Sequence, residues 1–133
     1  MENEEAVNKK VLIVEEVEDD VSIRNILRDT LMAEGFGVLD AKNGEEGLDI
    51  ALQYHPDLIL LDIVMPKMNG LAMLKKLRED EWGKTARVII LTNYDDNEKI
   101  AEAMGNEVFQ YLIKSDIKLE SLIKMIKSKI PKA

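Results

Sequence analysis

The chain has no cysteine among its 133 residues, which excludes disulfides and cysteine-based zinc, haem or redox sites. Its single histidine, His55, excludes a multi-histidine metal centre and argues against a catalytic triad. The longest apolar runs have four residues, as in Leu58–Leu61, far short of the roughly 20 that a membrane-spanning helix needs. Because the first ten residues, MENEEAVNKK, also lack the apolar segment of a signal peptide, we expect a cytoplasmic protein that does not associate with a membrane.

Positive charge is scarce as well. The 18 Lys and Arg residues are outnumbered by 26 Asp and Glu residues, so the net charge is −8. Such a surface repels nucleic-acid phosphates, and we expect no nucleic-acid partner. The length suits one domain, and a content of 46% hydrophobic and 33% charged residues is typical of a folded globular protein. We expect an acidic tail over residues 1–9 and a single domain over residues 10–131.

Short aliphatic runs recur along the chain between segments with helical periodicity. Several of these runs are almost continuously apolar, which is typical of strands buried on both faces of a parallel sheet. The predicted strands are Val11–Val14, Phe36–Leu39, Asp57–Leu61, Val88–Thr92 and Val108–Ile113.

A predicted helix follows each predicted strand. Their apolar stripes are Ile23, Ile26, Leu27 and Leu31; Leu48, Ala51 and Leu52; Leu71, Leu74 and Leu77; Ile100, Ala103 and Met104; and Leu119, Leu122, Ile123, Ile126 and Ile130. Gly35 is predicted to end the first helix, and Asn69 to cap the third. This alternation predicts an α/β fold, a five-stranded parallel sheet with helices on both faces in the (βα)5 flavodoxin-like, doubly wound arrangement.

Polar side chains gather at the predicted strand ends. An acidic run follows the first strand, Asp62 follows the third, Thr92 ends the fourth and Lys114 follows the fifth. In an open parallel sheet the functional site lies outside the carboxyl ends of the strands. Clustered carboxylates suit Mg²⁺, a carboxylate can attack phosphorus, and a lysine can neutralise phosphoryl oxygens. These groups therefore indicate phosphoryl-transfer chemistry at this edge.

Three segments resemble the response-regulator receiver domains of two-component signalling. PDLILLDIVMPKMNG resembles their phosphoacceptor region, VIILTN their fourth strand and YLIKSD their fifth strand. The resemblance extends over about residues 11–130. It implies a single-domain response regulator that receives a phosphoryl group from a sensor histidine kinase or a phosphotransfer protein. The output would be contact with a downstream protein whose identity the sequence does not give.

The resemblance also implies roles for individual residues. By position, Asp62 is the phosphorylated aspartate, Thr92 the switch hydroxyl, Lys114 the phosphoryl-binding lysine and Tyr111 the aromatic switch residue. A Mg²⁺ cofactor would be held by Asp62, by the main-chain carbonyl of Val64 and by an acidic residue after the first strand.

The acidic segment departs from the family pattern. Removing Glu15–Val17 from VEEVEDDVSIR would leave VLIVEDDVSIR, which fits the family without a gap, so we infer a three-residue insertion. Counting forward from the strand makes Glu16 the metal ligand, whereas counting back from the helix makes it Asp19. Two buried, unpaired carboxylates would cost several kcal/mol each. We therefore predict that the strand ends near Val14, and both acidic candidates stay open.

Other functions remain as alternatives. The insertion favours a pseudo-receiver, a binding module whose metal site is impaired. An aspartate-nucleophile phosphohydrolase would need a second Asp where Val64 stands, so we expect no enzyme beyond self-phosphorylation and self-dephosphorylation. A flavodoxin-like FMN carrier would need a phosphate-binding loop rich in Gly, Ser and Thr after the first strand. The lysines at positions 118, 124, 127 and 129 are expected to form a solvated helix face, with partner docking as the alternative.

Overall fold

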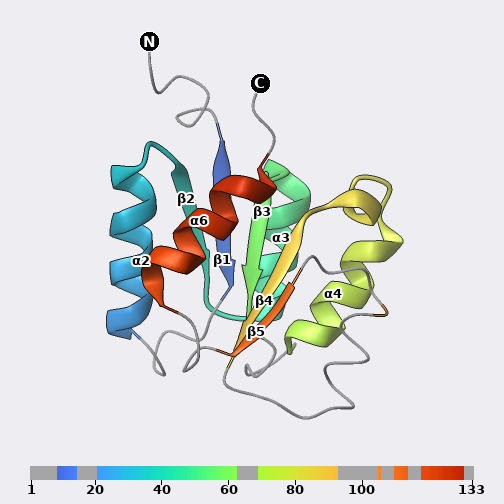
Figure 1. The fold of residues 1–133 in the computed structure, drawn as a ribbon. Helices are drawn as coiled ribbons and strands as arrows, with labels where there is room; N and C mark the ends of the chain where they lie inside the picture. The colour runs from blue at the N-terminus through green and yellow to red at the C-terminus, as the bar shows by residue number, and fades with distance from the viewer. Residues whose placement is uncertain are drawn as a thin grey trace.

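The computed structural model describes residues 9–14, 21–62, 69–92, 105, 110–113 and 118–130. Helices cover both faces of a parallel sheet (Figure 1). The strands are β1 (Lys10–Val14), β2 (Gly37–Ala41), β3 (Leu58–Leu61), β4 (Val88–Thr92) and β5 (Gln110–Ile113). The helices are α2 (Val21–Ala33), α3 (Gly44–Tyr54), α4 (Gly70–Glu79) and α6 (Leu119–Lys129), with a 3₁₀ turn η1 (Gly83–Thr85). The helix predicted around residues 100–104 lies outside the described residues.

The five strands are ordered β2-β1-β3-β4-β5, and all four neighbouring pairs are parallel. The chain runs from β1 to β2 on one side and then to β3 on the other, so the direction of winding changes beside β1. This is the strand order of flavodoxin-like doubly wound sheets. The predicted parallel α/β fold is confirmed for the described part of the chain. None of the helices described is long and apolar enough to cross a membrane.

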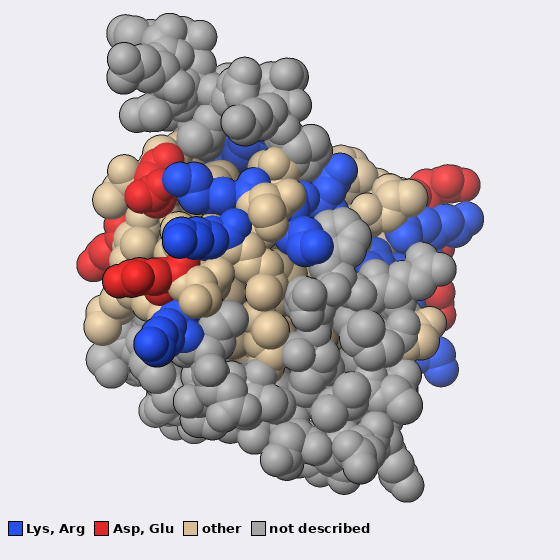
Figure 2. All heavy atoms as spheres, viewed as in Figure 1, with Lys and Arg blue, Asp and Glu red and all other residues tan. Residues whose placement is uncertain are grey.

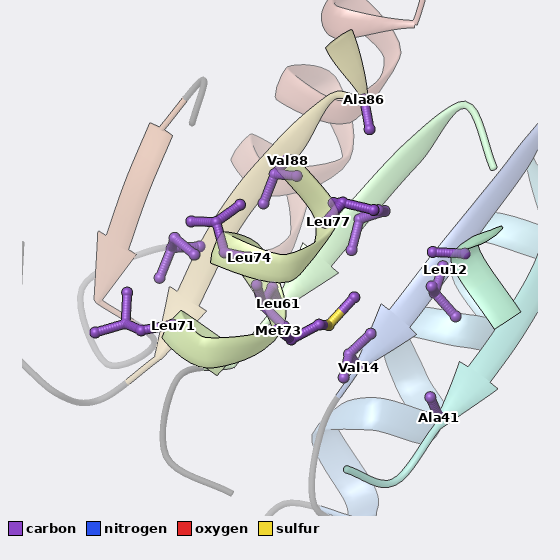
Figure 3. Close-up of a cluster of buried hydrophobic side chains, with 13 residues drawn as sticks. Leu12, Val14, Ala41, Leu61, Leu71, Met73, Leu74, Leu77, Ala86 and Val88 are labelled. Atoms are coloured by element: carbon purple, nitrogen blue, oxygen red, sulfur yellow. The ribbon is translucent and has the colours of Figure 1, made fainter. Parts of the chain in front are cut away.

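Alternating residues of the strands pack into two separate cores. Leu12 and Val14 face α3 and α4, and Figure 3 shows Met73, Leu74 and Leu77 projecting from α4 toward this side of the sheet. Val11 and Ile13 face the other side, where side chains of α2 and α6 pack on them. All residues of β3 and residues 11–14 of β1 are buried. The central strands are therefore apolar on both faces, as their sequences predict.

The helix boundaries follow local sequence signals. Gly35 adopts a φ of 99°, a conformation that glycine tolerates, and it ends α2 as predicted. Asn69 caps α4, its side-chain oxygen accepting from the amide of Ala72 at 2.9 Å, which confirms the predicted cap. His55 ends α3 with a φ of 49°, and its ring stacks on Trp82 with 4.3 Å between ring centroids. A non-glycine residue at positive φ is uncommon, and here its amide donates to the carbonyl of Ala51 as α3 ends.

Two residues of the predicted apolar stripes are not buried. Ile26 of α2 is 53% exposed and Leu119 of α6 is 36% exposed, although both belong to the apolar stripes of their helices. Ile26 is adjacent to the buried Leu27 but lies at the margin of the stripe, where it turns away from the sheet. Leu119 is in the first turn of α6, beyond the part of the helix whose side chains reach the core.

Two of the strand boundaries that differ from the prediction lie at an aspartate. β2 extends to Ala41 and includes Asp40, whose side chain is partly exposed and whose Oδ2 pairs with Nη1 of Arg28 at 3.2 Å. The Oδ1 of Asp40 is buried without a hydrogen-bond partner among the described residues. Asp57 stands before β3 instead of within it. Its side chain accepts from the amide of Lys10, and its own amide donates to the Lys10 carbonyl, both at 2.8 Å.

The connection from α4 to β4 is tied down by side chains. Arg78 donates from Nη1 to the carbonyls of Gly83 and Ala86, both at 2.7 Å. Asp80 accepts from the amide of Gly83 at 3.0 Å. These bonds press Gly83 against the end of α4, so that a Cβ at this position would lie 1.9 Å from the carbonyl oxygen of Leu77.

We predict that Gly83→Ala destabilises the protein by about 1–3 kcal/mol or more, because backbone atoms must move to admit the methyl group. Urea unfolding followed by circular dichroism measures the change. The matched control is Gly37→Ala, where the nearest atom to the added Cβ would be the Lys10 Cγ at an ordinary 3.4 Å. Equal stability of the two variants would contradict the prediction.

Candidate functional site

Asp62 marks the carboxyl edge of the sheet. It follows β3 directly and is only 7% exposed, and its amide donates to the carbonyl of Val14 at 3.0 Å. Among the described residues, the other buried polar side chain is that of Asn43, which is 6% exposed. Burial of a carboxylate is costly, so its retention at a strand end is typical of a functional group.

The strand register brings the predicted site residues of β3 and β4 together. Leu61 pairs with Ile90, so continuation of the register sets Asp62 level with Leu91, one residue before Thr92. Thr92 in turn pairs with Ile113 at the end of β5. The backbones of Asp62 and Thr92 therefore reach the same edge, as the sequence predicts. Tyr111 lies within β5, paired with Ile90; the side chains of Thr92 and Tyr111 are outside the described part of the structure.

Two of the helices that begin at this same edge are capped by asparagine. Asn43 caps α3, its Oδ1 accepting from the amide of Glu46 at 2.8 Å, and a Glu46 carboxylate oxygen accepts from the Lys42 amide at 3.3 Å. Asn69 caps α4. The amino ends of helices carry partial positive charge, so both favour negative charge at this edge of the sheet. Sequence reasoning missed Asn43, although an Asn followed three residues later by Glu is a capping signal.

The remaining predicted site residues fall outside the described residues. These are Glu16 and Asp19 of the acidic segment, Val64, and Lys114, which follows Ile113 in the sequence. β1 ends at Val14, as predicted, and α2 begins at Val21. No group of three or more acidic or histidine side chains that could hold a metal is found within the described ranges. Asp62 is the predicted metal ligand whose side chain the structure places.

Comparison with known proteins identifies the family of this chain. The family model of the response regulator receiver domain matches residues 11–127 of this sequence. The chain belongs to this receiver family. Receiver domains are phosphoacceptor modules of two-component and phosphorelay signalling and not classical enzymes.

Individual receiver proteins match this chain over most of its length. The polar-differentiation response regulator DivK of Brucella ovis is 35% identical over 125 residues, covering 92% of this chain and 96% of its own. Sporulation initiation phosphotransferase F of Bacillus subtilis is 37% identical over 97 residues, covering 73% of this chain and 74% of its own.

Solved receiver structures share the fold. The chemotaxis protein CheY4 of Vibrio cholerae has a TM-score of 0.78 and 31% identity, covering 90% of this chain and 97% of its own. A CheY-like receiver domain protein of Methanospirillum hungatei has a TM-score of 0.81 and 28% identity, covering 92% and 93%. The receiver assignment thus applies to sequence and fold alike.

The Asn69 cap fixes where α4 begins beside this receiver site. We predict that Asn69→Ala lowers the free energy of unfolding by about 1 kcal/mol, because the Ala72 amide loses its acceptor. Asn69→Asp keeps a side-chain oxygen in that place and should retain most of the stability. Urea titration of the three proteins compares them; a loss of the same size in both variants would contradict the capping role.

Proposed function

We propose that this receiver domain accepts a phosphoryl group on Asp62 from a histidine kinase or a phosphotransfer protein in the cytoplasm, and signals by contact with a downstream protein. The observation that carries the proposal is the buried carboxylate of Asp62 directly after β3, within the segment PDLILLDIVMPKMNG. Residues 10–131 would form the complete (βα)5 domain, with residues 93–109 supplying the remaining helix, and residues 1–9 an acidic tail.

The proposed reaction is an in-line transfer to a carboxylate. A carboxylate oxygen of Asp62 attacks the phosphorus, and the bond from phosphorus to the donor histidine nitrogen breaks. The donor nitrogen keeps the electron pair of that bond, and Asp62 becomes an acyl phosphate. Lys114 would neutralise the phosphoryl oxygens and Thr92 would donate a hydrogen bond to the product. A change at Thr92 and Tyr111 would then shift a pre-existing equilibrium toward the active conformation.

A magnesium ion would suit the oxygen ligands that the sequence assigns to this edge. Asp62, the Val64 carbonyl and either Glu16 or Asp19 would supply oxygen ligands, which Mg²⁺ prefers. When bound, the ion reduces the repulsion between the Asp62 carboxylate and the incoming phosphoryl oxygens. The part played by the chain is to hold Asp62, through its amide and the Val14 carbonyl, at a constant position.

Phosphorylation of Asp62 can be tested with a small-molecule donor. We predict that incubation with acetyl phosphate and Mg²⁺ adds the mass of one phosphoryl group, labile to acid and base, and that Asp62→Asn shows no adduct. Intact mass spectrometry measures both proteins. Asp49→Asn is the matched control, because Asp49 is exposed on α3 and its variant should be labelled as the parent is. An adduct that persists in Asp62→Asn would overturn the proposal.

A second candidate function is the pseudo-receiver, a binding module with an impaired metal site. What favours it is the Glu15–Val17 insertion, which lies in the six-residue connection between β1 and α2. In this case the receiver fold would serve as a protein-binding scaffold, and its function would not depend on Mg²⁺ binding at Asp62. Metal affinity separates the two candidates.

We predict that the intact chain binds Mg²⁺ more weakly than a variant lacking residues 15–17. Mg²⁺ requires near-octahedral oxygen ligands at about 2.0–2.1 Å, so a carboxylate displaced by three extra residues fits it poorly. Titration calorimetry measures both affinities, with the corresponding Asp62→Asn proteins as controls for binding elsewhere. Equal affinities would show that the insertion is neutral and would remove the main support of the pseudo-receiver.

A further inference from the structure

β2 is an outer strand of the sheet and pairs with β1 on one side. The amide of Gly37 donates to the carbonyl of Lys9 at 2.9 Å, so Gly37 faces β1. Because the backbone groups of a strand alternate in direction, Leu39 also faces β1, whereas Val38 and Asp40 direct their amide and carbonyl groups away from it. Among the residues that the structure describes, no strand and no turn supplies a backbone partner on that outer side.

We define the β2 edge as the outward backbone groups of Val38 and Asp40 together with the side chains of residues 38–40. These side chains are all partly exposed. Val38 packs partly on the core beneath α2 and α6, and Leu39 packs partly on the core beneath α3 and α4. A further strand beside β2 would therefore cover apolar surface on both faces of the sheet, and it would supply partners for the outward amide and carbonyl groups.

Asp40 places a carboxylate on the β2 edge. Its Oδ2 pairs with Arg28, whereas its Oδ1 has no hydrogen-bond partner among the described residues. The side chain as a whole is 29% exposed, so a cation can approach the carboxylate from the open side of the strand. Opposite charges on neighbouring strands attract and like charges repel. A strand with a lysine or arginine opposite Asp40 would thus give this carboxylate its second partner.

α3, one of the helices in contact with β2, has an acidic surface. It carries Glu45, Glu46 and Asp49 and no Lys or Arg. On the face that Figure 2 shows, Lys and Arg side chains gather over α6, whereas Asp and Glu side chains lie toward the margins, including the left, where Figure 1 has α2. Lys42, directly after β2, offsets part of the negative charge. The surroundings of the β2 edge therefore favour a basic segment over an acidic one.

We propose that the β2 edge binds an extended segment of a partner protein, containing lysine or arginine, as an added strand of the sheet. In this mode of recognition the main-chain hydrogen bonds give affinity, and alternate side chains give specificity. A second copy of the chain fits less well, because β2 contains no lysine or arginine to stand opposite Asp40. Two chains of net charge −8 also repel each other. A charge on an edge strand thus discourages self-association and selects a basic strand.

The test adds a short blocked peptide, in which lysine and valine alternate, to the unphosphorylated chain. Amide hydrogen exchange, read from ¹⁵N–¹H spectra, reports on each backbone amide separately. We expect the peptide to slow exchange at Val38 and Asp40, whose amides point to the open side. The amide of Leu39 already faces β1, so its exchange should stay unchanged. A matched peptide of alternating glutamate and valine should bind several-fold more weakly, because it sets like charge opposite Asp40.

Two substitutions separate backbone pairing from charge. Val38→Pro removes an outward amide without removing a bond to β1, and the affinity for the lysine peptide should fall roughly tenfold or more. Val38→Ala, its matched control, keeps the amide and should lose less. Asp40→Asn should weaken binding about two- to fivefold. Glu79→Gln removes the same charge at an exposed position of α4, at the far side of the sheet in Figure 1, and should bind as the parent does.

Several results would overturn the proposal: no saturable binding by the parent, protection at β5 instead of β2, or equal losses in Val38→Pro and Val38→Ala. Protection of β2 that grows with protein concentration in the absence of peptide would assign the edge to a second copy and overturn it as well. If circular dichroism shows that Val38→Pro is unfolded, exchange in the parent and the Asp40→Asn comparison decide. The inference does not rest on phosphorylation, so failure of the Asp62 mechanism would appear only in the acetyl phosphate experiment.

Discussion

The hydrogen bond from the Asp62 amide to the Val14 carbonyl joins the end of β3 to the end of β1, and much of the site depends on where these two strands stop. Residues 11–14 of β1 and all of β3 are buried on both faces of the sheet. A polar side chain within either strand would lose its hydration without gaining a partner. Polar groups are therefore confined to the strand ends, and the parallel arrangement collects those ends at one edge.

This constraint explains why the fold could be predicted from the sequence. Continuous apolar runs that alternate with amphipathic segments specify parallel strands and covering helices, and glycine or asparagine at the helix ends specifies where helices stop or start. Two departures from the predicted pattern have different causes. Asp40 lies within β2, where Arg28, twelve residues away in the sequence, pairs with one of its carboxylate oxygens. Ile26 belongs to an apolar stripe, but periodicity gives the direction of a stripe and not its width.

The part of the site that could be predicted from the sequence consists of residues at the ends of strands. Asp62 and Thr92 reach the same edge by register, and the family resemblance, not their chemistry alone, distinguishes Asp62 from an ordinary capping aspartate. The choice between Glu16 and Asp19 as metal ligand could not be made from the sequence, because it depends on the path of the chain between β1 and α2. Every candidate there is charged, so neither burial nor periodicity ranks one above another. Asn43 was missed because a capping role leaves only a weak local signal.

The site and α6 are linked through a short piece of chain. Lys114, the proposed phosphoryl-binding residue, follows β5 and precedes Lys118 by four residues, a distance of at most about 14 Å along an extended chain. Direct electrostatic influence of a phosphoryl group at Asp62 is screened over about 10 Å at ordinary ionic strength. A movement of Lys114 toward that group, in contrast, acts on the start of α6 through covalent bonds. Lys118 at the N-cap of α6 makes no side-chain capping bond, so the first turn of the helix is where such a pull would most easily change the structure.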